Sequence, residues 1–152
     1  MDAIDLSLVD LLRGNARLSY AELARQVGLS APAVHERVGK LESGGVIRAY
    51  RAEVEPETIG LGVTALISIV EDSGADTDDV LEAFRAIPEI ESCYFMAGVE
   101  SFLLKARVGS IAELEQLIVR LNRTPGVNST RTSIALSTKW ENRPQSVAPP
   151  AG

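Results

Sequence analysis

Residues 19–45 read SYAELARQVGLSAPAVHERVGKLESGG, and this stretch decides the fold of the N-terminal part of the chain. Ser19 and Glu22 have the spacing of a capping box, which predicts that a helix begins there. Gly28 predicts the end of this helix, and Ser30 predicts the cap of the next one, which ends at the glycine pair that closes the stretch. Two helices joined by a tight glycine turn form a helix-turn-helix motif.

A further helix is predicted before the motif, over residues 3–13, because Ile4, Leu8, Leu11 and Leu12 recur at helical spacing. The second helix of the motif also has one apolar face. We expect this face to pack against the other two helices and to leave the opposite face exposed. The apolar face consists of Ala31, Val34, Val38 and Leu41.

The exposed face of the motif's second helix is a candidate DNA contact. In helix-turn-helix domains this helix enters the major groove, where its N-terminal residues approach base edges and flanking basic residues approach phosphates. Ala33 and Glu36 are placed for base edges, with Glu36 accepting from a cytosine amine. His35 lies on the flank, where a half-buried packing role is favoured over a DNA contact. The candidate DNA-binding residues are Arg17, Arg25, Ser30, Pro32, Ala33, Glu36, Arg37 and Lys40, and the four basic ones suit phosphates.

Charge is distributed unevenly along the chain. The net charge of −6 argues against a general affinity for nucleic acid. Residues 17–51, however, have six basic and three acidic residues, a net charge of +3, whereas residues 52–152 have eight basic and 15 acidic residues, a net charge of −7. This asymmetry indicates a small anion-facing module joined to an acidic body that DNA would repel. The alternatives are chance clustering of charge and a purely structural helical module.

Length and composition exclude several classes of protein. The chain has 152 residues, of which 45% are hydrophobic and 24% are charged, as is typical of one soluble domain or two small ones. Its longest uncharged apolar stretch, LGVTALISIV, is shorter than the roughly 20 residues of a membrane helix. Its N-terminus, MDAID, is acidic where a signal peptide is basic. We therefore expect a cytoplasmic protein with no membrane partner.

The chain has one cysteine, Cys93, and one histidine, His35. A disulfide within the chain is therefore excluded, and zinc clusters and histidine-based catalytic triads lack their usual residues. We expect no metal, no cofactor and no enzymatic activity.

From residue 63 onward, the sequence predicts a strand–helix–strand unit that occurs twice. The order β-α-β-β-α-β is that of the ferredoxin-like fold, a four-stranded antiparallel sheet with both helices on one face, so the chain belongs to the α+β class. The uncovered face must be buried, and a second copy is its simplest cover, which predicts a homodimer. The predicted strands are 63–71, 90–98, 101–108 and 127–138, and the predicted helices are 77–87 and 110–122.

Four segments follow from these patterns. Residues 1–50 are predicted to form the helix-turn-helix domain, and residues 51–62 a linker that reads as extended chain up to Pro56. Residues 63–140 are predicted to form the ferredoxin-like domain. Residues 141–152 form a tail without periodicity, which we expect to be mobile.

The run DLLRGNARLSYAELARQVGLSAPAVHERVGKLESGGVIRAY, residues 10–50, followed by the β-α-β-β-α-β body, resembles the Lrp/AsnC family of feast/famine transcriptional regulators. The resemblance covers residues 2 to about 143 and includes the GGVIRAYRAEV exit and the Pro-Gly-Val turn before the last strand. It implies an N-terminal DNA-binding domain and a C-terminal ligand-sensing RAM domain. It also implies dimers that assemble further, often to octamers, with an amino acid bound between dimers.

In this family the sensor loop joins the second and third strands, which here is MAGVESFLL, residues 96–104. Gly98 matches the family's glycine, and a glycine lets the backbone approach a ligand carboxylate. Members commonly have an aspartate where this chain has Ser101, so Glu100 or hydroxyl groups are expected to replace it. The alternative is an ordinary hairpin. The candidate effector-binding residues are Met96, Ala97, Gly98, Val99, Glu100, Ser101, Thr132 and Ser133.

The residues and the resemblance together favour a sequence-specific regulator whose DNA binding or assembly responds to a small effector, an amino acid. A siroheme-decarboxylase-like enzyme is an alternative, because such enzymes share the two-domain architecture. The single histidine, however, lies in the predicted reading helix rather than in a pocket of the second domain. A third hypothesis is an architectural DNA-binding protein that does not respond to effectors.

Overall fold

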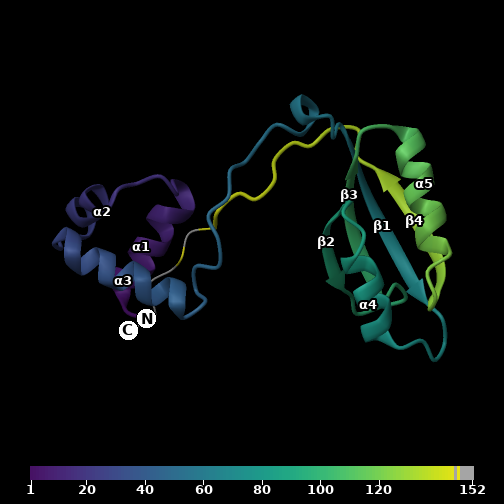
Figure 1. Ribbon diagram of the computed structural model, residues 1–152, viewed down its shortest axis with the longest axis horizontal. Helices are drawn as coiled ribbons and strands as arrows, with labels where there is room; N and C mark the ends of the chain where they lie inside the picture. The colour runs from purple at the N-terminus through teal and green to yellow at the C-terminus, as the bar shows by residue number, and fades with distance from the viewer. Residues whose placement is uncertain (146, 148–152) are drawn as a thin grey trace. The chain divides into compact units, whose positions relative to one another are not determined.

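The computed structural model describes residues 1–145 and 147. The chain divides into two compact units (Figure 1). The helical unit comprises Met1–Glu53 and the described residues from Trp140 onward, and the sheet unit comprises Val54–Lys139. In this described part, no helix is long and apolar enough to cross a membrane.

The helical unit contains the three predicted helices, which are α1 (Ala3–Gly14), α2 (Tyr20–Val27) and α3 (Ala31–Ser43). The predicted capping box is confirmed: Ser19 Oγ accepts a hydrogen bond from the Glu22 amide (3.2 Å), and Glu22 Oε2 accepts one from the Ser19 amide (2.8 Å). Gly28 ends α2 in the left-handed conformation, with φ at +71°, which glycine adopts without a steric penalty.

The three helices share one apolar core. Fully burying a large aliphatic side chain stabilises a fold by about 1.5–3 kcal/mol, so this core suffices to fix the packing of three short helices. Because its α3 residues all lie on one side, the other side of that helix faces solvent, as the periodicity predicted. The buried residues are Leu8, Leu12, Leu23, Ala24, Val34, Val38 and Leu41.

The sheet unit has the predicted ferredoxin-like topology. Its four strands are antiparallel to their neighbours and lie in the order β2-β3-β1-β4, with both helices on one face (Figure 1). A short 3-10 helix, Pro56–Ile59, precedes the first strand. The elements are β1 (Val63–Glu71), α4 (Thr77–Arg85), β2 (Ile90–Phe95), β3 (Phe102–Val108), α5 (Ile111–Asn122) and β4 (Val127–Ile134).

Side chains along each strand point alternately to the two faces of the sheet, and one face is buried whereas the other is open. On β3, every second residue from Phe102 to Val108 is buried against the two helices, and the Phe102 ring meets the Phe84 ring of α4 edge-on at 5.4 Å. On the other side of the sheet, Leu66 and Tyr94 are 42% and 54% exposed. Within the sheet unit, no described helix covers this second face.

Three elements end before their predicted last residue, and the first of them, strand β2, ends at Phe95 instead of residue 98. Strand β4 ends at Ile134 instead of residue 138, because β1 begins at Val63 and the last bond of this ladder runs from the Ala135 amide to the Thr64 carbonyl (2.9 Å). In this register, residues 137 and 138 lie beyond Val63, the first residue of the partner strand. Helix α4 ends at Arg85, two residues before the predicted end.

The described end of the chain belongs to the helical unit. The Arg13 guanidinium of α1 donates to the Gln145 carbonyl, and the Val147 amide donates to the Asp10 carboxylate at 3.1 Å. Gln145 and Val147 of the tail therefore contact α1. The prediction of a mobile tail at residues 146 and 148–152 lies outside the described residues.

Candidate DNA-binding and effector sites

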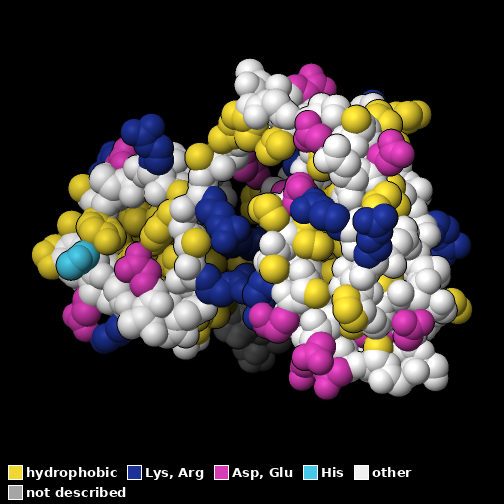
Figure 2. All heavy atoms as spheres, turned by 45° about the vertical axis from the view of Figure 1, so that its right-hand side comes forward, with side chains coloured by type: hydrophobic (Ala, Val, Ile, Leu, Met, Phe, Trp, Pro, Cys, Tyr) yellow, Lys and Arg dark blue, Asp and Glu magenta, His cyan; other side chains and the backbone are white. Residues whose placement is uncertain are grey.

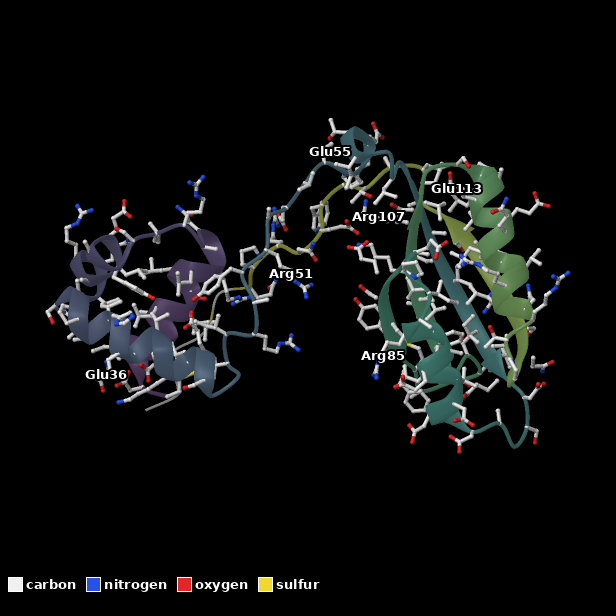
Figure 3. The ribbon with its side chains drawn as sticks, viewed as in Figure 1. Glu36, Arg51, Glu55, Arg85, Arg107 and Glu113 are labelled. Atoms are coloured by element: carbon white, nitrogen blue, oxygen red, sulfur yellow. The ribbon has the colours of Figure 1, made fainter. Side chains whose placement is uncertain are left out.

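The exposed side of α3 contains the residues that were predicted to read DNA. Pro32 and Glu36 are exposed, and Ala33 is half-buried, so all three present atoms to solvent from the N-terminal half of the helix. Glu36 projects outward from α3 (Figure 3), and its Oε1 atom accepts a hydrogen bond from Lys40 Nζ at 2.6 Å. This bond lowers the pKa of Glu36, so the side chain is an ionised acceptor.

The basic candidates differ in their freedom to move onto a phosphate. Arg17 and Arg25 are exposed and form no ion pair with another described residue, and the Lys40 side chain is 73% exposed. A guanidinium without a carboxylate partner binds phosphate without first breaking an ion pair. Ser30 stabilises the start of α3, because its Oγ atom accepts a hydrogen bond from the Ala33 amide (3.4 Å) and so caps the helix.

Arg37 is engaged within the protein. Its Nη1 atom lies 2.7 Å from Asp5 Oδ1 and 2.8 Å from Asp2 Oδ2, both at the N-terminus of α1. The hydrogen bonds to Asp5 and Asp2 raise the pKa of Arg37. The Asp5 amide and then Arg37 lower the pKa of Asp2. This arrangement was not predicted from the sequence, although Asp2 and Asp5 have the spacing of a capping pair.

His35 packs against a neighbouring helix but is not half-buried. It is exposed, and its ring meets the ring of Tyr20 at 4.9 Å between centroids, with an angle of 65° between the planes. The contact joins α3 to α2, in agreement with a packing role.

A hollow of about 530 Å³ lies beside the predicted reading residues. Its walls come from α1, from α3 and from the turn that follows α3, so it belongs wholly to the helical unit. The residues that line it are Met1, Asp5, Ala33, Glu36, Arg37, Lys40, Leu41 and Val46.

The loop between β2 and β3 contains most of the predicted effector contacts. The Met96 amide donates to the Ser101 carbonyl and the Ser101 amide donates to the Ile69 carbonyl, both at 2.8 Å, so both ends of the loop are held by the sheet. Gly98 has φ at +145°, and a Cβ atom there would have nothing within 4 Å. Val99 is 81% exposed. The loop therefore presents bare backbone and an apolar tip to solvent.

A smaller hollow, of about 200 Å³, lies on the open face of the sheet next to this loop. Glu100 and Arg131 form an ion pair there, with Glu100 30% exposed and Arg131 74% exposed. Opposite charges and hydroxyl groups around one small hollow suit a zwitterion of limited size. The lining residues are Ser68, Val70, Glu100, Ser129, Thr130 and Arg131.

Thr132 and Ser133 lie on opposite faces of the sheet. Thr132 pairs with Ile67, which is buried under the helices, whereas Ser133 pairs with Leu66 on the open face. The structure therefore does not bring these two candidates together. Sequence analysis missed Arg131, although its alternation with Ser133 was a signal that both share a face.

The open face of the sheet also has an ionic network. Glu91 of β2 lies 2.7 Å from Arg107 and 3.2 Å from Lys105, both on β3, and the two basic side chains are only 13% and 12% exposed. A carboxylate of the neighbouring strand therefore holds both basic side chains of β3 in place. Figure 2 shows apolar, basic and acidic side chains interspersed on the side of the sheet unit that the view presents.

Comparison with known proteins agrees with both halves of this description. Residues 1–42 match the model of the AsnC-type helix-turn-helix domain, and residues 63–145 match that of the Lrp/AsnC ligand binding domain. The transcriptional regulator LrpA of Mycobacterium tuberculosis is 40% identical over 143 residues, which are 94% of this chain and 95% of the relative.

Two solved structures contain an amino acid. One is a feast or famine regulatory protein of Mycobacterium tuberculosis complexed with L-methionine, 39% identical, with a TM-score of 0.90 over 96% of this chain and 99% of the other. The second is a transcriptional regulator of Neisseria meningitidis in complex with L-methionine, 27% identical, with a TM-score of 0.88 over 97% and 96% of the two chains.

Fold and site together define a protein with an N-terminal DNA-binding module and a C-terminal ligand-binding module. The chain belongs to the Lrp/AsnC family of transcriptional regulators.

Proposed function

We propose that this protein binds double-stranded DNA through α3 and regulates transcription in response to an amino acid. The observation that best supports this function is the solvent-facing side of α3, where Ala33 and Glu36 stand free of the apolar core. Ser30 and Pro32 lie at its start, and α3 is the second helix of the motif, the one that enters the major groove in helix-turn-helix domains. The unpaired cations Arg17 and Arg25, together with Lys40, supply the phosphate contacts.

For the effector site, we propose that an amino acid inserts into the ion pair of the smaller hollow. Its ammonium group replaces Arg131 as the partner of Glu100, and its carboxylate accepts from Arg131 and from the amides around Gly98. Met96, Ala97 and Val99 supply an apolar wall beside the hollow, and Ser101 and Ser133 add hydroxyl groups, whereas Thr132 lies on the helix-covered face of the sheet and does not reach the effector. The two relatives with bound L-methionine support this class of ligand.

We propose that the open face of the sheet is covered by a second copy, which gives a homodimer that assembles further to an octamer. Exposed apolar side chains, including Leu66 and Tyr94, would otherwise remain in water. An effector that binds one assembly state more tightly shifts the population and therefore changes the spacing of the DNA-binding units. The protein would act in the cytoplasm and without enzymatic activity, as relatives named as transcriptional regulators suggest.

The test is fluorescence anisotropy of DNA from the gene's own upstream region, at fixed salt, with and without each amino acid. Saturable binding that outcompetes bulk DNA and changes with a subset of amino acids supports the proposal. Binding that no amino acid changes would favour an architectural protein. The matched control is Glu100→Gln, which should keep the DNA affinity and lose the response.

A further inference from the structure

The N-terminus of α1 and the middle of α3 are joined by a closed hydrogen-bond network. Asp2 and Asp5 form a capping box, in which Asp2 Oδ1 accepts from the Asp5 amide and Asp5 Oδ2 accepts from the Asp2 amide, both at 2.9 Å. The remaining oxygens, Asp2 Oδ2 and Asp5 Oδ1, accept from Arg37 Nη1. Each carboxylate therefore uses one oxygen for the helix cap and the other for α3.

This network makes Arg37 a poor phosphate contact. The cluster holds two carboxylates and one guanidinium, so its formal charge is −1, which repels a phosphate. To reach DNA, the guanidinium would have to leave both carboxylates. The side chains of Asp5 and Arg37 are 16% and 32% exposed, so solvent screens this pair less than it screens the exposed pair of Glu36 and Lys40.

The position of the network links it to the reading residues. Arg37 follows Glu36 directly and precedes Val38, which is 1% exposed and packs in the core. Asp5 and Arg37 also line the larger hollow together with Ala33 and Glu36. A change in the packing of α1 against α3 would therefore move the residues that are proposed to meet base edges.

We infer that Arg37 is a positioning residue, which latches α1 to α3 and so fixes how Ala33 and Glu36 are presented to DNA. The inference rests on the proposed DNA-binding function and assigns Arg37 a role other than the phosphate contact that its sequence position suggests. Through the latch, the acidic N-terminus of α1 contributes to DNA binding without touching DNA.

The decisive experiment is the Asp5→Asn variant, for which the two roles predict opposite signs. If Arg37 is a latch, loss of its carboxylate weakens DNA binding roughly threefold or more. If Arg37 is a phosphate contact, removal of a competing negative charge strengthens binding. Asp10→Asn is the matched control, because Asp10 lies on the same helix, also pairs with an arginine, Arg13, and is not part of the latch.

The second experiment measures the salt dependence of DNA affinity. Arg37→Gln should lower the affinity at every salt concentration and leave the slope of log K against log salt unchanged. Arg25→Gln should reduce the slope by about 0.9, the value for one lost phosphate contact. The inference would be overturned if Arg37→Gln reduced the salt slope as much as Arg25→Gln does, or if Arg37→Gln did not lower the DNA affinity.

A double variant, Asp5→Asn with Arg37→Gln, shows whether weaker DNA binding comes from loss of the latch or from general unfolding of the helical unit. The double variant should bind DNA no more weakly than the weaker single variant, because both changes break the same contact. Additive losses would contradict the inference. If the unmodified protein itself fails to bind DNA, the proposed function fails, and the non-additivity measured in thermal unfolding still tests the latch.

Discussion

The helical unit and the sheet unit differ in how their candidate sites are built. In the helical unit, Glu36 and Lys40 share a surface because they lie four residues apart on one helix. In the sheet unit, the smaller hollow combines Ser68 of β1, Arg131 of β4 and Glu100 of a loop. These residues meet only because the strands adopt the order β2-β3-β1-β4. A site on one helix is therefore encoded locally, whereas a site across strands depends on the whole sheet.

The largest effect is expected from damage to one core, which tests whether the units fold independently. Phe102 is 1% exposed and contacts the rings of Phe84 and Phe95. Phe102→Ala should destabilise the sheet unit by about 3–5 kcal/mol, because it removes a large buried ring and leaves a cavity. Hydrogen exchange followed by mass spectrometry should show lost amide protection in residues 54–139.

The matched variant in the other unit is Leu23→Ala, which truncates a fully buried side chain of α2. It should lower the free energy of unfolding of the helical unit by about 2–5 kcal/mol, which hydrogen exchange detects as lost amide protection in that unit. If either variant lowers protection equally in both units, the units do not fold independently and the comparison between them fails.

A pair of glycine substitutions should shift stability in opposite directions in the two units. Gly126 precedes β4 with φ at +86°, and a Cβ atom there would lie 2.6 Å from Val80 Cγ2. Gly126→Ala should therefore cost about 2 kcal/mol or more, through strain and overpacking. Gly39 lies within α3 with open space around its Cα, so Gly39→Ala should stabilise the helical unit by about 0.5–1 kcal/mol.

Denaturant unfolding of both variants checks this pair. A stabilised Gly126→Ala variant would mean that the tight turn before β4 is not needed. If Gly39→Ala were destabilising, the surface of α3 at Gly39 would have to contact a part of the protein other than α1 and α2.

The sequence predicted the caps of α2 and α3, because a capping box and a terminal glycine act within one turn of helix. It also predicted the β-α-β-β-α-β succession of the sheet unit and the exposed side of α3. It did not predict the contact between Arg37 and Asp5, which are 32 residues apart, or the pair of Glu100 and Arg131. Such contacts form only when the helices or strands pack together. The periodicity of apolar residues within one element does not show which residues of another element lie near it.

Arg131 allows the site across strands to be tested without disturbing the helical unit. Arg131→Gln removes the proposed partner of the effector carboxylate and should weaken effector binding by about tenfold or more, the usual value of a charge-assisted hydrogen bond. Isothermal titration calorimetry gives this affinity. DNA affinity without effector should not change.

The control is Ser129→Ala, which removes a hydroxyl group from the same hollow and keeps its charges. It should weaken effector binding by less than Arg131→Gln does. Equal affinities for Arg131→Gln and the unmodified protein would place the effector outside this hollow.

The smallest effect concerns Tyr50, which joins the segment after α3 back onto that helix. Its Oη atom donates to Glu42 Oε1 at 2.8 Å. Burial, and then this hydrogen bond to a carboxylate, raise the pKa of Tyr50 from its ordinary value of 10.0 to about 12. Since the folded pKa lies above the unfolded one, the stabilisation is fully present below pH 10 and is lost as the pH rises towards 12.

Tyr50 is 47% exposed, so solvent screening keeps the resulting loss of stability well below the full value that the pKa shift would imply. An ultraviolet titration of phenolate absorbance should show one tyrosine that ionises about two pH units late. The Tyr50→Phe variant removes one of the three tyrosines, so the difference between the two titrations belongs to Tyr50 alone. A difference curve centred at pH 10 would mean that the contact with Glu42 does not persist in solution, and that the segment after α3 is held less firmly than α3 itself.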